Sequence, residues 1–229
     1  EAKKANLFQF FMPELRKIKE EKNEKMINEE ELSEIKIDNQ YEFENNRKIG
    51  ENDSYICQMI RDDSVKEFIS YVNKKNLSLS HTIIERSIFE TNLFLIENNP
   101  SLIEYAAFYG SIQIFQYLKL SGVELNESLW LYAIHSKNAE LIHLLEENQV
   151  KPSDETYEEC LIESIKCNHN DIAKYIEDNL LIQNHENLDK ENKLKEKIIS
   201  ACFQYSNYEY FPREFNSNFV FFYLIKYNY

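Results

Sequence analysis

The sequence predicts an all-α protein built from repeated pairs of antiparallel helices. The 229 residues include only three Gly and four Pro, which is too few for the many tight turns of an all-β fold. Leu, Ile, Glu and Lys, which suit helices, are abundant, and 43% of the residues are hydrophobic. Three segments of the chain also align with one another without gaps, as the units of a repeat protein do.

Residues 1–53 are predicted to form a charged helix followed by a linker. Residues 13–35 are dominated by Glu and Lys with sparse apolar positions, which indicates an exposed helix with ion pairs between residues four apart. A coiled-coil partner helix is the alternative. Residues 36–53 are rich in Asn and Asp, whose side chains compete for backbone hydrogen bonds, so a linker is expected there. The apolar start of the chain has no small-residue cleavage site, and no signal peptide is expected.

Residues 54–229 are predicted to form the repeat domain. In each unit a helix ends at small residues, a polar turn follows, and the second helix carries apolar residues at i, i+3 and i+4. The small residues Ala106, Ala133 and Ser164 let two helices approach closely and recur at intervals of 27 and 31 residues. The turns must tolerate a left-handed backbone. They are centred on Gly110, on Lys137 with Asn138, and on Asn168.

The repeat domain divides into six units and one insertion. The units span about 54–76, 101–125, 126–150, 154–180, 192–212 and, incomplete, 216–229. The insertion at 77–100 is expected to contain a helix over 83–96. Pro212 is expected to break the second helix of the fifth unit, and the chain is expected to stop inside a repeat. Ser101 with Glu104, and Thr156 with Glu159, predict capping boxes at two helix starts.

The repeated unit resembles a known family. Residues 106–123, which read AAFYGSIQIFQYLKLSGV, resemble the second half of the ankyrin repeat, A-A-x-x-G-H-x-E-I-V-x-L-L followed by G-A. His169 stands where the family has its turn His. From about residue 54 the chain also resembles the divergent ankyrin proteins of unicellular eukaryotes, which carry a domain of unknown function that overlaps the first repeats.

The resemblance implies an ankyrin-like solenoid of stacked antiparallel helix pairs. Its β-hairpin fingers are expected to be degenerate or missing. One reason is that residues 101–104, SLIE, replace the family's T-P-L-H opening. The other is that a spacing of 27 residues is shorter than the family's repeat of about 33.

The resemblance also implies where a partner binds. In ankyrin stacks the two residues after the A-A pair face the concave groove. The corresponding residues of this chain are Phe108 and Tyr109, His135 and Ser136, and Lys166 and Cys167. Exposed aromatic side chains there would anchor a partner. The alternative is that Phe108 and Tyr109 pack against the insertion at 77–100.

No motif predicts catalysis, a cofactor or a metal site. With three Gly the chain has neither G-x-S-x-G nor a phosphate-binding loop. The histidines and cysteines that could be considered as metal ligands match no zinc spacing, and the histidines are expected to be structural. These residues are His135, His143, His169, Cys160 and Cys167. His143 is expected on an exposed helix face.

Charge and cysteine content restrict the class of binding partner and the cellular compartment that are expected. The formal net charge is -14, and residues 101–180 contain five Lys and no Arg against fourteen Asp and Glu. Such a surface disfavours nucleic acid and anionic membranes. Four cysteines without a C-x-x-C pair favour an intracellular, cytoplasmic or nuclear protein. The sequence therefore predicts a non-catalytic module that binds another protein, with a basic protein as one candidate. A structural or regulatory spacer for repeats or domains beyond residue 229 is the alternative.

Overall fold

The computed structural model describes residues 10–22, 39–181, 188–212 and 225–226. Within these residues the secondary structure is helical apart from a single isolated bridge between Ile83 and Ser101. The all-α prediction is therefore confirmed for the part of the chain that is described. None of its helices is both long and apolar enough to cross a membrane.

Among its described residues, the N-terminal part contains the helices α2 (Met12–Lys22) and α4 (Gln40–Ile49). The linker predicted for 36–53 is thus wrong over residues 40–49. The Asn39 side chain accepts a hydrogen bond from the Glu42 backbone and so caps α4 instead of breaking it. The buried Phe43 ring packs edge-on against Phe89, with ring centroids 5.2 Å apart. Residues 23–35 of the predicted charged helix lie outside the described residues.

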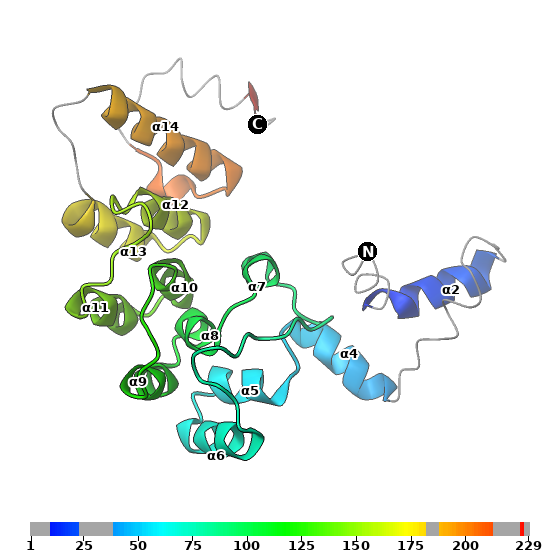
Figure 1. The fold of residues 1–229 in the computed structure, drawn as a ribbon. Helices are drawn as coiled ribbons and strands as arrows, with labels where there is room; N and C mark the ends of the chain where they lie inside the picture. The colour runs from blue at the N-terminus through cyan, green and yellow to red at the C-terminus, as the bar shows by residue number, and fades with distance from the viewer. Residues whose placement is uncertain (1–9, 23–38, 182–187, 213–224, 227–229) are drawn as a thin grey trace.

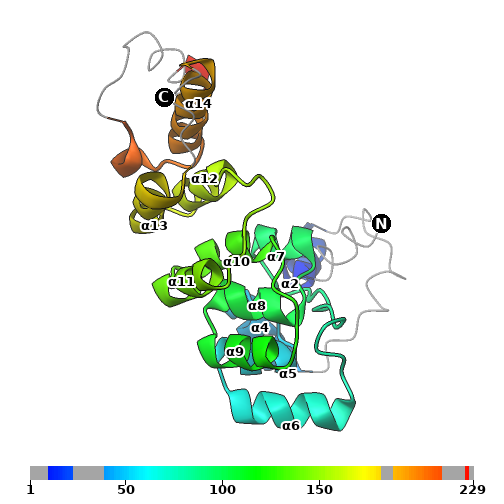
Figure 2. The same cartoon turned by 60° about the vertical axis from the view of Figure 1, so that its left-hand side comes forward.

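Four helix pairs follow in chain order. They are α5 (Tyr55–Arg61) with α6 (Val65–Lys75), α8 (Leu102–Tyr109) with α9 (Ile112–Leu120), α10 (Leu129–Ser136) with α11 (Ala139–Glu147), and α12 (Glu158–Lys166) with α13 (Asn170–Tyr175), which runs into the π-helical turn Ile176–Leu180. Each first helix contacts the first helix of the next pair. The second helices α9, α11 and α13 lie along one side of this row (Figures 1 and 2).

A fifth unit continues the row of first helices. Helix α14 (Leu188–Gln204) packs on α12 and is followed by the short 3-10 helix η2 (Tyr208–Tyr210). The second helix predicted to break at Pro212 is therefore only one turn long. Of the incomplete unit predicted at 216–229, only residues 225–226 are described.

The turns within the units share one backbone conformation. Their central residues have positive φ, as the sequence predicted for three of them. These residues are Asp63, Gly110, Lys137, Asn168 and Ser206. In four turns the next residue donates its backbone N–H, over 2.9 Å, to the carbonyl five residues earlier, which is the Schellman closure of a helix end. The four donors are Ser64, Ser111, His169 and Asn207.

The turns also join each unit to the one before it. His169 lies 2.8 Å through Nδ1 from the carbonyl of Ile134 in the preceding unit, and Asn207 donates over 2.8 Å to that of Ile165. Ser111 makes the equivalent bond to Ile60. The small residues Ala106, Ala133 and Ser164 are fully buried. The repetition thus extends from local turn geometry to the contact between neighbours.

The inserted segment 77–100 is less helical than predicted. Its helix, α7 (Leu93–Asn98), covers only the end of the expected range 83–96. The Asn92 side chain accepts hydrogen bonds from the Phe94 and Leu95 backbones and so starts the helix late. Helix α7 lies on the side of α8 and α10 opposite α9 and α11 (Figure 1).

The two predicted helix caps have different outcomes. The capping box of Ser101 with Glu104 forms at the start of α8. The box of Thr156 with Glu159 does not form at the start of α12. The Asp154 carboxylate takes its place, because it accepts hydrogen bonds from the Tyr157 and Glu159 backbones over 3.1 Å and 3.0 Å.

Candidate functional site

The six residues predicted to face a partner lie at the C-terminal ends of α8, α10 and α12. The packing of these helices brings three of the six residues into contact with one another in a series. The rings of Phe108 and His135 stack with centroids 4.9 Å apart, and the Cys167 sulfur lies 3.5 Å from Nδ1 of His135. Residues from three successive units therefore meet at one place.

Helix α7 covers Phe108, the first of these contacting residues. The Phe94 ring stacks on Phe108 at 6.1 Å and contacts the His135 ring at 4.3 Å, so that Phe108 is only 9% exposed. Phe108 thus packs against the inserted segment, which is one of the two outcomes that the sequence left open. It is not an exposed anchor for a partner.

The other predicted aromatic residue, Tyr109, also contacts Phe108, with ring centroids 5.1 Å apart. The Tyr109 ring packs on Tyr105 with centroids 4.8 Å apart, and the Arg61 guanidinium of α5 lies 5.8 Å from it. Burial raises the pKa of the Tyr109 phenol to about 12. Ser136 has a local role, since its hydroxyl donates to the carbonyl of Ala133 within the same turn.

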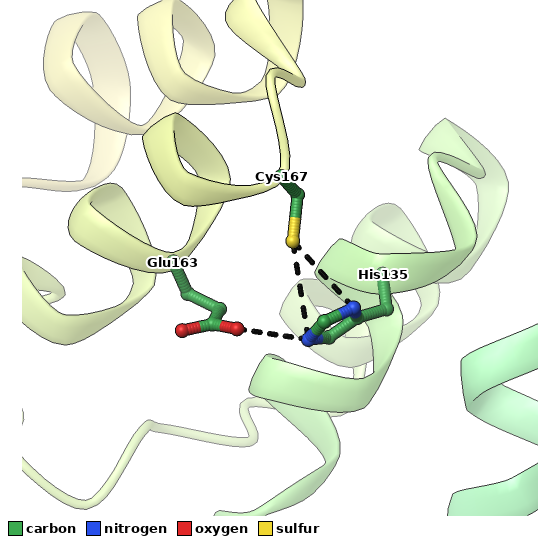
Figure 3. Close-up of side chains that lie close together, drawn as sticks. All are labelled: His135, Glu163 and Cys167. Atoms are coloured by element: carbon green, nitrogen blue, oxygen red, sulfur yellow. Dashed lines mark hydrogen bonds and ion pairs between the residues drawn. The ribbon is translucent and has the colours of Figure 1, made fainter. Parts of the chain in front are cut away.

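A side chain that the sequence did not single out completes the site. Nε2 of His135 lies 2.9 Å from a carboxylate oxygen of Glu163, and Figure 3 shows the Glu163 and Cys167 side chains both pointing toward the His135 ring. We call these three residues the His–Glu–Cys cluster. Among the described residues, they are the one group of three metal-binding side chains whose ligand atoms lie within 4.8 Å of one another.

Glu163 escaped prediction because it precedes the positions taken from the family resemblance. It stands four residues before Cys167, so both side chains lie on the same face of α12. The spacing of four residues could therefore have predicted that Glu163 and Cys167 lie near each other. The approach of the shared face to His135, however, depends on how α12 packs on α10.

The electrostatics of the cluster keep the thiol protonated. Burial alone raises the pKa of the Glu163 carboxyl, but hydrogen bonds from His135 and Lys166 outweigh burial and hold that pKa below its ordinary value. Lys166 Nζ lies 3.0 Å from the carboxylate. Burial raises the pKa of the Cys167 thiol to about 12, and the Glu163 carboxylate adds to the rise. Cys167 is therefore a neutral thiol at pH 7.

The geometry does not resemble a thiol–imidazole catalytic pair. The Cys167 sulfur lies 3.5 Å from Nδ1 and 3.9 Å from Nε2 of His135. A thiol on the lone-pair axis of one nitrogen would be much farther from the other, so the sulfur lies on neither axis. The imidazole is thus not placed to take the thiol proton along a hydrogen bond.

A hollow of about 340 Å³ opens beside the cluster. We call it the acidic groove. Its walls come from α10, α12 and α14. They consist of Leu131, Glu158, Glu159, Ile162, Glu163 and Lys197.

The three carboxylates of the groove differ in their partners. Glu158 pairs with Lys197 over 2.8 Å, and Glu163 pairs with Lys166 and His135. Glu159 is exposed, and its carboxylate accepts a long 3.5 Å hydrogen bond from the Ser153 hydroxyl. Within the described residues no basic side chain pairs with Glu159. It is the carboxylate most available to an incoming cation.

The remaining histidines and cysteines have structural surroundings. The His143 side chain is 59% exposed, as predicted, and lies 3.1 Å from Glu146 on its own helix. His169 joins two units through its bond to Ile134. All four cysteines are free thiols, and those outside the cluster are buried.

Comparisons of the chain with protein-family models, with curated proteins and with solved structures give no match.

Proposed function

We propose that this chain is a protein-binding module whose helix pairs form an ankyrin-like solenoid. The repeated left-handed turns and the hydrogen bonds that join each turn to the preceding unit support this proposal. In such a stack each unit buries its apolar face against its neighbours. The row of first helices is then the concave face that a partner contacts. The four free thiols suit an intracellular location.

The observation that carries the binding proposal is the acidic groove. Helix α7 fills the face over α8 and α10, where Phe94 contacts Phe108 and His135. The groove lies next along the same face, between α10, α12 and α14. The predicted residues Lys166 and Cys167 lie beside it on α12. Binding is therefore assigned to the later units, beyond the face that α7 covers.

The chemistry of the groove favours a basic side chain of a partner protein. Leu131 and Ile162 offer an apolar wall, and Glu159 offers a carboxylate that pairs with no basic side chain of the described residues. A Lys or Arg side chain suits such a place because its long stem packs on apolar surface while its charged end reaches the acid. Nucleic acid and anionic lipid do not suit it.

A charge reversal in the groove tests the proposal. The full chain and its Glu159→Lys variant are used as baits in cell lysate, and the retained proteins are quantified by mass spectrometry. Glu147→Lys is the matched control, because Glu147 is an exposed acid on α11, on the other side of the row. We expect partners to be lost with Glu159→Lys and kept with Glu147→Lys, and we expect the loss to shrink as salt rises.

If the wild type, Glu159→Lys and Glu147→Lys retain the same proteins, the groove is not the binding site. A bait that retains no protein specifically would instead favour the alternative, a structural or regulatory spacer for further repeats or domains.

A further inference from the structure

The His–Glu–Cys cluster offers three different donor atoms at one point between two helices. An imidazole nitrogen comes from α10, a carboxylate oxygen comes from α12, and a sulfur comes from Cys167, the C-cap residue of α12. The side chains are largely shielded, with His135 11% and Glu163 14% exposed. Nitrogen, sulfur and carboxylate oxygen are the donors that Zn²⁺ takes in proteins.

The distances within the cluster are close to those that one ion requires. Around a tetrahedral zinc ion, ligand atoms of these types lie about 3.3 to 3.6 Å apart. Here Nε2 of His135 lies 2.9 Å from the Glu163 oxygen and 3.9 Å from the Cys167 sulfur. The sulfur lies off the lone-pair axis of Nε2, so the Cys167 side chain must turn to another rotamer before one ion can contact both atoms, with both helices left in place.

The surroundings hold one ligand and leave another free to adjust. The His135 ring packs against the rings of Phe94 and Phe108, with centroids 4.3 Å and 4.9 Å away. Glu163 is held by Lys166, whose side chain is 37% exposed and can swing into solvent. Glu163 also lines the acidic groove, so water and ions reach the cluster from that side.

We propose that His135, Glu163 and Cys167 form a binding site for a zinc-like divalent transition metal ion, with a fourth position open to water from the acidic groove. On binding, the Cys167 thiol gives its proton to solvent and its sulfur forms a metal–thiolate bond. The ion replaces the contacts of Glu163 with His135 and Lys166. It links α10 to α12 and so stiffens the junction between two units.

Titration with Co²⁺ tests the site, because cobalt replaces zinc and reports its ligands by absorption. The purified full chain is titrated with Co²⁺ alone and then with Zn²⁺ as competitor. We expect one Co²⁺ per chain, the visible bands of a four-coordinate ion, and a near-ultraviolet sulfur-to-cobalt band that Zn²⁺ abolishes. The same chain with Zn²⁺ should unfold at a higher temperature than without it.

Single substitutions distinguish Co²⁺ binding at the cluster from adventitious binding elsewhere on the chain. Cys167→Ser should abolish the sulfur band. His135→Gln and Glu163→Gln should each weaken binding by about tenfold or more, since even outer-shell changes have effects of that size. His143→Gln is the control, because His143 is an exposed histidine beside an acid but outside the cluster. Circular dichroism verifies that each variant is folded.

The proposal is overturned if folded wild-type chain shows no sulfur band, or if Cys167→Ser and His135→Gln bind Co²⁺ as the wild type does. These titrations contain no partner protein, so their result is independent of the binding function proposed above.

Discussion

At the scale of single residues, the turn between α8 and α9 depends on Gly110. Its φ of 69° lies in the left-handed region, where residues with a Cβ are strained. An added Cβ would also lie 3.3 Å from Nδ2 and 3.4 Å from Cβ of Asn138, in the next unit. Gly110 therefore allows the left-handed backbone of its own turn and the close approach of the turn in the following unit.

Replacing Gly110 by Ala should destabilise the protein more than replacing Gly122. Gly122 has a φ of 86° but nothing within 4 Å of its Cβ position, so Gly122→Ala isolates the backbone strain of about 1–2 kcal/mol. Gly110→Ala adds the crowding against Asn138 and Ser136. Urea unfolding of both variants measures the difference. Equal free energies of unfolding would show that contact between the units adds nothing at this position.

At the scale of elements, one buried amide joins the unit of α14 to the unit before it. The Asn207 side chain is 2% exposed and donates to the Ile165 carbonyl and to the Asn170 side chain, over 2.8 Å and 2.7 Å. Its backbone N–H closes the turn after α14. The same residue thus ends one helix and joins it to the unit before.

Substitution of Asn207 by Ala should loosen α14 selectively. The Ile165 carbonyl would lose its buried side-chain donor, at a cost of about 1–3 kcal/mol. Hydrogen exchange followed by mass spectrometry should show faster exchange in α14 and unchanged exchange in α8 and α9. Asn148→Ala is the control, since the exposed Asn148 bonds only within its own helix end. Faster exchange throughout the chain would contradict a local role.

At the scale of the whole molecule, packing follows the order of the chain. First helices contact first helices of neighbouring units, and α14, the last of them among the described residues, packs on α12. In such an arrangement the ends are held from one side only, so they open more easily than the centre. Trp130, the single tryptophan, lies fully buried in the central unit and donates to the Val150 carbonyl over 2.7 Å.

The fluorescence of Trp130 therefore reports unfolding at the centre of the row. The central unit should unfold at a higher urea concentration than the molecule as a whole. In urea, far-UV circular dichroism should fall at lower concentrations than those that change the tryptophan fluorescence. The Asn207→Ala variant should shift the early part of the dichroism curve and leave the fluorescence midpoint in place. Superimposable curves would indicate a single cooperative unit.

Local patterns were sufficient for much of the fold. Alternation of apolar stripes with polar turns predicted the helix pairs from residue 54 to about 180, because helix periodicity and turn residues are properties of neighbours in sequence. Gly110, Lys137 and Asn168 were identified as left-handed for the same reason. The approach failed at 40–49, where Asn and Asp predicted a linker but Asn39 caps a helix. It also failed at 83–92, where a helix was predicted but the helix begins only after its cap Asn92.

The sequence by itself determined the helix pairs, their turns and the acidic character of the repeat domain. Only the tertiary structure decided that α7 covers Phe108, that Glu163 meets His135, and that a groove opens beside Glu159. Each of these contacts joins side chains from separate helices. Their meeting depends on how the helices pack, and packing is set by the shapes of whole buried faces rather than by the spacing of residues along the chain.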